Sequence, residues 1–269
     1  MSYRLLSMLS KIVGIILYFI KFQINMDRNN RAIRPWPRRN PDPEQEEPNE
    51  INARKLRIFI FKVYLCAAIL CLLSAIPWIC VSVLKPPVYS DIPVPPFMWL
   101  IITFVLLTVL SCAPQTPVTL WLCWGLVLGS LFFITLFGCY FVVLMSVWVV
   151  VGAMGISVVL LALLHLYGAK APMLMLPNML CTCAVMLVGF ITLFVLLMMS
   201  LFTNDGRYVL ASAIVFFIIV IFLAPFQASF ICGRLQQVPY GEVASCANGI
   251  YMHFCFLATC LMIFASFTK

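Results

Sequence analysis

The feature that most constrains this chain is a succession of apolar segments running from residue 58 almost to the C-terminus. At 1.5 Å of rise per helical residue, these segments are about as long as the hydrocarbon core of a bilayer is thick, roughly 30 Å. Backbone polar groups in lipid must be paired internally, and a helix pairs them within one segment. The sequence therefore predicts an all-α fold, a polytopic membrane bundle of about seven transmembrane helices. The predicted helices are 58–84, 96–112, 118–138, 142–166, 173–202, 208–231 and 243–267.

Composition supports lipid as the solvent of this chain. Only 10% of its residues are charged, against roughly 25% in ordinary soluble domains, so water could not wet its surface. The net charge of +8 would suggest nucleic acid as the partner of a soluble protein. In a membrane protein it is explained more simply by the excess of basic residues in cytosolic segments and by attraction to anionic lipid. We therefore expect the bilayer as partner and no nucleic acid, while membrane-protein partners and oligomeric state stay open.

The boundaries between predicted helices are set by Pro, Gly and polar residues, as in Lys85-Pro86-Pro87. The junction of the third and fourth helices, near Gly138 to Tyr140, carries no charge. Orientation follows from basic residues, which favour the cytosol. The cluster at the start of the first helix predicts a cytosolic N-terminus, with two later residues on the same side: Arg54, Lys55, Arg57 and Lys62, then Lys170 and Arg234. Lys85 and Arg207 oppose this orientation but are outnumbered.

Two segments precede the membrane domain, which is predicted to span 58–269. Residues 1–26 are predicted to form an amphipathic helix in the membrane interface, because six polar or small residues recur at steps of three and four: Arg4, Ser7, Lys11, Gly14, Tyr18 and Lys21. A signal peptide is the competing interpretation, although no small-x-small cleavage site follows. Residues 27–57 are rich in Pro and charge and predict a disordered cytosolic tether, or less simply a Pro-rich recognition segment around Arg34 to Pro37.

Residues that carry chemistry are scarce in the predicted membrane domain. The cysteines fall mainly in or beside apolar runs, where they pack as small hydrophobes, and no C-x-x-C pair occurs. The two histidines, His165 and His253, are far apart in sequence, so we expect no metal site and no cofactor. His165 ends the fourth predicted helix and is expected at the interface. Ser229 or Ser245 beside His253 would be needed for serine-protease chemistry, but no supporting motif accompanies them, so we expect no enzyme.

Several short motifs in order resemble one family. Arg57 to Tyr64 resembles the basic, apolar, K-V-Y opening of the Bax-inhibitor/lifeguard membrane proteins, and Pro117 with Gly129 resembles the start of their third span. Near the C-terminus, three blocks are similar to that family's A-Y-D-T-Q, G-N-R and I-Y-x-D blocks: Leu223 to Gln227, Gly233-Arg234 and Ile250 to His253. The resemblance implies a seven-helix protein of the endoplasmic reticulum or Golgi, with roles in calcium leak and in negative regulation of apoptosis.

One departure from the family pattern bears on function. The resemblance implies a pair of acidic residues, one on the sixth helix and one on the seventh, that forms a proton-sensitive latch on a calcium path. Gln227 and His253 stand at these positions, and no Asp or Glu lies within a predicted span. Calcium prefers several carboxylate or carbonyl oxygens, so calcium as a transported ion is in question here. Gln227 and His253 are nevertheless the candidate latch residues, and we expect them to approach within side-chain contact.

His253 has two interpretations on its own chemistry. Hydrogen-bonded to Gln227 or to a Tyr hydroxyl, it would be a satisfied structural residue, whereas in a wet cavity it would titrate and gate a path. Three functions follow from the sequence: a divergent lifeguard-type protein, a non-conducting membrane scaffold that acts through partner contacts, and an unrelated seven-span transporter of small solutes. An internal repeat would favour the transporter, and we find none.

Overall fold

The computed structural model describes residues 47–88, 94–113, 119–171, 179–203, 205–234 and 241–267, with the side chains of 47–53, 97, 179–181 and 201 left out. Within these ranges the chain forms seven helices: α2 (Glu47–Leu84), α4 (Pro96–Cys112), α5 (Leu120–Val142), α6 (Val147–Lys170), α7 (Met179–Thr203), α8 (Gly206–Ile231) and α9 (Val243–Phe267). All but α4 are long and apolar enough to cross a membrane, and α4 is a shorter apolar helix. The predicted all-α membrane bundle is confirmed.

The N-terminal boundary of the bundle differs from the prediction. Helix α2 begins at Glu47, so residues 47–57, predicted as the end of the tether, are helical. Pro48 lies in the first turn of α2, where backbone N–H groups have no partner within the helix, so its missing N–H costs no hydrogen bond. Adding residues to the start of an existing helix also avoids the unfavourable step of helix nucleation. The predicted interfacial helix and residues 27–46 of the tether lie outside the described residues, and both stay predictions.

The junction between the third and fourth predicted helices is also corrected. Helix α5 continues through Gly138 and Tyr140 to Val142, and α6 begins at Val147. No proline interrupts this stretch, and Gly138 has a packing role instead of a turn role. A Cβ built on Gly138 would lie 2.3 Å from the indole of Trp78, so the glycine lets the buried indole approach α5. The Trp78 Nε1–H donates to the carbonyl of Thr135 at 3.0 Å, which joins α2 to α5.

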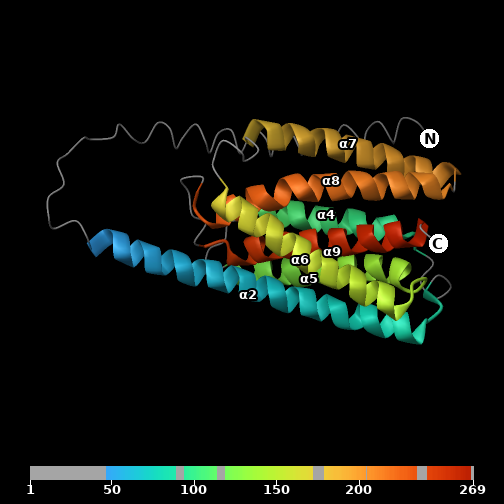
Figure 1. Ribbon diagram of the computed structural model, residues 1–269, viewed down its shortest axis with the longest axis horizontal. Helices are drawn as coiled ribbons and strands as arrows, with labels where there is room; N and C mark the ends of the chain where they lie inside the picture. Colours follow the sequence, from blue (N-terminus) through green and yellow to red (C-terminus); the bar gives the residue numbers. More distant parts are fainter. Residues whose placement is uncertain are drawn as a thin grey trace.

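Helix α9 forms the centre of the bundle and packs against α2, α5, α6 and α8 (Figure 1). Its apolar window is 72% buried, whereas each of the other five long helices is at most 33% buried and faces outward over much of its surface. Small residues along α9, such as Ala247 and Ala258, allow neighbouring backbones to come close. A functional side chain on α9 is therefore enclosed by protein and not by lipid.

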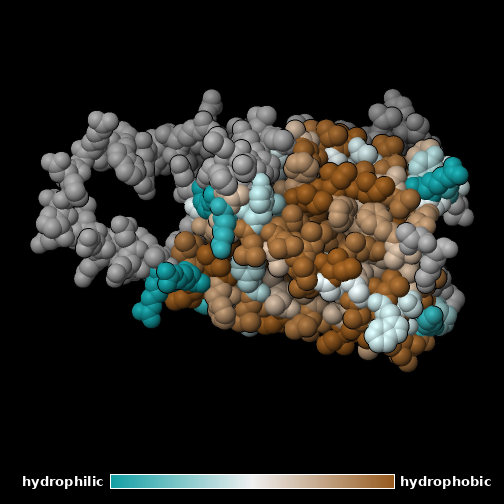
Figure 2. All heavy atoms as spheres, in the orientation of Figure 1, coloured by the Kyte–Doolittle hydropathy of each residue, from teal (hydrophilic) through white to brown (hydrophobic). Residues whose placement is uncertain are grey.

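The outer surface identifies where a membrane would lie. Figure 2 shows a broad hydrophobic face in the middle of the long axis, with hydrophilic residues gathered towards its two ends. On α6 the exposed aromatic residues Trp148 and Tyr167 stand nineteen residues apart. That separation is about 28 Å along the helix, close to the thickness of the hydrocarbon core, and Trp and Tyr favour the two interfaces. The bundle axis therefore runs across the bilayer.

Candidate functional site

The motif residues from the C-terminal part of the sequence gather at one end of the bundle, which we call the base. The base is the end where the spanning part of α2 starts, near Arg54, where α6 and α8 finish and where α9 begins. Hydrogen bonds from α8 to α6, from α8 to α9 and from α2 to α6 place these four helix ends together. The candidate site is built at this end.

Helices α6 and α8 touch through their backbones at the base. A Cβ built on Gly168 of α6 would lie 2.2 Å from the carbonyl oxygen of Pro225 on α8. The Ser229 hydroxyl donates towards the Gly168 carbonyl at 3.0 Å and towards the Pro225 carbonyl at 2.9 Å. Gly168 is therefore required for this close crossing, and Ser229 stabilises it from the α8 side.

The Gly233-Arg234 motif ends α8 and joins it to α6. Gly233 adopts a positive φ of 69°, while the Gly233 N–H donates to the Phe230 carbonyl and the Arg234 N–H donates to the Ser229 carbonyl. These two bonds are the Schellman motif that closes many helices. The turn directs the Arg234 guanidinium to the carbonyls of Gly168 and Ala171 at the end of α6. Arg234 thus supplies donors and positive charge to carbonyls that helix α6 cannot pair itself.

Gln227 lies between α8 and α9. Its side-chain NH₂ donates to the carbonyl of Cys246 at 3.0 Å. A Cβ built on Gly249 would lie 2.3 Å from that nitrogen, so the glycine makes room for the amide. The other end of the amide, Oε1, is buried without a hydrogen-bond partner. Gln227 therefore holds α8 against the first turns of α9 and keeps one strong acceptor unused.

His253 and His165 form a second part of the site. His253, on α9 one turn after Gly249, is only 8% exposed, and its Nδ1 has no partner. His165, on α6, is 4% exposed, and its Nδ1 lies 2.8 Å from the Tyr64 hydroxyl of α2. The Nε2 of His165 is buried without a partner. The two imidazoles are close enough to influence each other electrostatically, so the site joins α2, α6 and α9.

These positions can be compared with the predicted site. Gln227 and His253 both lie at the base, against or on α9, but no hydrogen bond between them occurs in the described residues, and the predicted side-chain contact stays a prediction. The expectation for His165 is corrected, because it faces the protein interior and bonds Tyr64 instead of standing at the interface. Tyr64 and His165 were both missed as site residues. The sequence feature that could have identified them is the presence of an ionisable side chain within an apolar helix, because such residues are functional candidates by default.

Apart from the Arg234 guanidinium, which is bonded to carbonyls at the end of α6, the side chains of the site offer neutral donors and acceptors. No group of three or more His, Cys, Asp or Glu suited to a metal ion occurs in the described part of the chain. The carboxylate closest in sequence is Glu242, which directly precedes α9, and partial burial raises the pKa of this carboxyl. Amides, imidazoles and hydroxyls can bind water, but they lack the negative charge that attracts and dehydrates a divalent cation.

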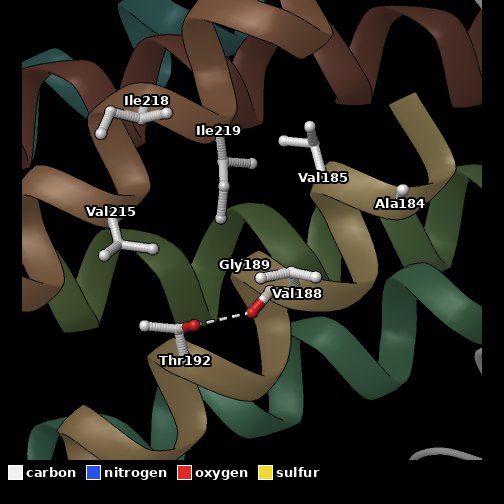
Figure 3. Close-up of a pocket in the computed structure, with 8 residues that line it drawn as sticks. All are labelled: Ala184, Val185, Val188, Gly189, Thr192, Val215, Ile218 and Ile219. Atoms are coloured by element: carbon white, nitrogen blue, oxygen red, sulfur yellow. Dashed lines mark hydrogen bonds between the residues drawn. The ribbon is translucent and has the colours of Figure 1, made fainter. Parts of the chain in front are cut away.

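Two apolar grooves lie on the outer surface of the described helices. Figure 3 shows a groove of about 370 Å³ between α7 and α8, lined by Val188, Gly189, Ile219 and other apolar side chains. Its one hydroxyl, on Thr192, is already bonded to the Val188 carbonyl. A second groove of about 530 Å³ lies on α6 around Gly152 and Gly155 and is also apolar. Both grooves suit acyl chains and offer nothing to an ion.

Comparison with known proteins adds no relative to this geometry: no protein-family model, no curated protein and no solved structure matches the chain.

Proposed function

We propose that this chain is a divergent endomembrane protein of the Bax-inhibitor/lifeguard type, with the implied roles in calcium homeostasis and negative regulation of apoptosis, and that it conducts calcium weakly or not at all. One observation carries the proposal. Gln227 lies on the sixth helix and contacts the central helix α9, and His253 lies on α9 itself, the seventh; the resemblance assigns these two residues to the family's acidic pair.

The physical reason for weak conduction is the cost of dehydrating the ion. A divalent cation that leaves water gives up a large favourable hydration free energy. A few neutral oxygens do not replace it, unless several of them surround the ion or a carboxylate neutralises its charge. Gln227 offers one free neutral oxygen, and His253 offers a nitrogen, a poor ligand for so hard an ion. No Asp or Glu lies between Arg54 and Leu84 or in any of the later helices. These helical spans therefore lack the charge that a calcium path needs, and the carboxylate of Glu242 stands outside them, directly before α9.

The test is calcium efflux from liposomes that contain the purified full chain. Changing Gln227→Asp together with His253→Asp should raise the efflux rate, and the rate should fall at acidic pH, because two neighbouring carboxylates then share a proton. The matched control is Gln227→Asn with His253→Asn, which has nearly the same shape without the charge. The control should leave the efflux rate at the level of the unmodified protein.

Two outcomes would contradict the proposal in different ways. If the unmodified protein releases calcium as fast as a family member that retains both acids, the neutral pair is a working latch and weak conduction is wrong. If the Asp pair behaves like the Asn pair, these positions do not line an ion path. A chain that never conducts, with or without acids, would instead favour the membrane scaffold acting through partner contacts.

We further propose that the base faces the cytosol of an endoplasmic reticulum or Golgi membrane. The distribution of basic residues supports this orientation. Six basic residues of the described chain lie at the base, whereas two lie at the opposite end: Arg54, Lys55, Arg57, Lys62, Lys170 and Arg234 against Lys85 and Arg207. Protease digestion of an N-terminal tag on sealed microsomes tests it, and a protected tag would reverse the orientation.

A further inference from the structure

Four buried side-chain polar atoms lack a hydrogen-bond partner in the described residues. One of them, Nδ2 of Asn248, belongs to a side chain that is bonded through its oxygen to Ser130 of α5. The other three lie on three different helices that meet at the base. They are Nε2 of His165 on α6, Oε1 of Gln227 on α8 and Nδ1 of His253 on α9. Both histidines are more than nine-tenths buried. Burying a polar atom without a hydrogen bond destabilises the folded state, so several such atoms in one core are unusual.

Packing around α9 brings the three side chains towards one another. The Gln227 amide lies over Gly249, and His253 follows Gly249 by four residues, hence on the same face of α9. Helices α6 and α9, which carry His165 and His253, pack directly against each other, and the two rings are near enough to interact electrostatically. His165 is held in place by Tyr64, which leaves its Nε2 as the ring atom directed away from that bond.

The donors and acceptors of these atoms can be counted for either tautomer. If the Tyr64 hydroxyl donates to His165 Nδ1, then Nε2 of that ring carries a hydrogen and needs an acceptor; in the other tautomer, Nε2 needs a donor. The same holds for His253 Nδ1, while Gln227 Oε1 always needs a donor. When at least one of the two rings presents an N–H, a partner that both donates and accepts satisfies all three atoms. Water does so, and a buried water typically makes about three hydrogen bonds.

We propose that His165, Gln227 and His253 together bind one water molecule between α6, α8 and α9 at the base of the bundle. A metal ion fits this site less well, because the donor set carries no negative charge to offset the ion's dehydration. The water links Tyr64, His165 and His253 into one hydrogen-bonded path from α2 to the central helix. The inference goes beyond the proposed function, since it holds whether or not the chain conducts calcium.

The first test is a double-mutant cycle on thermal unfolding of the full chain in detergent. His165→Leu and His253→Leu should each lower the apparent Tm, on the order of 2–8 °C, because each removes one partner of the water. The double variant should lose clearly less than the sum, since the second replacement removes an atom already left unpaired. The control pairs His165→Leu with Thr103→Val, which removes a buried hydroxyl on α4 that is already bonded to the Trp99 carbonyl of its own helix. That pair should be additive.

The second test identifies the occupant. A high-resolution experimental structure of the full chain should show one density peak within hydrogen-bonding distance of at least two of the three atoms, and metal analysis of the purified protein should find no stoichiometric metal. Additive losses for the two histidines overturn the proposal. So does a direct hydrogen bond from His165 to His253, or a bound metal at the peak, and in these cases the calcium measurements above are unaffected.

Discussion

Replacing Gly168 by Ala is the sharpest test of the packing at the base. The added Cβ would lie 2.2 Å from the carbonyl oxygen of Pro225, 2.7 Å from its Cα and 2.8 Å from its carbonyl carbon. All three are backbone atoms of a helix, so no side chain can rotate out of the way. Helices α6 and α8 must move apart, and the Gly168 carbonyl then moves away from the donors on Ser229 and Arg234.

The magnitude follows from three contributions. Overpacking a close contact costs about 1–3 kcal/mol. Loss of the two hydrogen bonds to the Gly168 carbonyl costs about 1 kcal/mol each. Alanine regains up to about 1 kcal/mol through its better helix propensity. The net loss of unfolding free energy is about 3 kcal/mol, which corresponds to a fall in apparent Tm of about 6–12 °C.

The assay is thermal unfolding of the purified full chain in detergent, with Gly152→Ala as the matched control. Gly152 lies on the same helix, and a Cβ built there meets nothing within 4 Å. Its replacement should leave the apparent Tm unchanged or slightly higher. If Gly168→Ala and Gly152→Ala melt together, α6 and α8 do not cross in backbone contact at Pro225, and the description of the base is wrong.

Two further predictions concern the ends of α8 and α9. Gly233→Ala should lower the unfolding free energy by about 1–2 kcal/mol, because the backbone φ of 69° at this position strains an L-residue. Gly233→Asn should lower it less, since Asn tolerates the left-handed conformation better. Equal losses for Ala and Asn would contradict the left-handed cap. For Glu242, burial raises the pKa above the usual 4.5, so the folded state binds the proton more readily than the unfolded state and stability falls as pH rises through the raised pKa. Glu242→Gln should therefore raise the apparent Tm at pH 7 and bring no gain at pH 4; melting curves that shift equally at both pH values would refute this.

Much of the fold could be predicted from the sequence because a lipid environment permits few backbone structures. Stretches without charge had to become helices, and prolines and polar turns marked most of their ends, as at Pro96 and Val243. Two boundaries were wrong for local reasons. The start of α2 at Glu47 was hidden by Pro48 and acidic residues that also fit a disordered tether, and Gly138 resembled a turn because its partner, Trp78, lies far away in the sequence.

The candidate site was only partly accessible from sequence. Gln227 and His253 were predicted from the order of short motifs, and their role as a latch stays a prediction. His165 and Tyr64 were missed because they belong to other helices and make their contact across 101 residues. Motif order places a residue along one helix, but it carries no information about which distant helix will face it.

The amino-acid sequence by itself determined the solvent of this protein, its helical class and the approximate ends of its spans, because each depends only on the length and polarity of consecutive residues. Tertiary structure alone decided that α9 is central, that His165 turns inward to Tyr64 and that the Gln227 amide lies against Gly249 of α9. The physical reason is that these helices are apolar on nearly every side. In water an amphipathic stripe tells which face is buried, but a helix surrounded by lipid needs no such stripe, so its rotation and its neighbours are set by close packing and by a few hydrogen bonds.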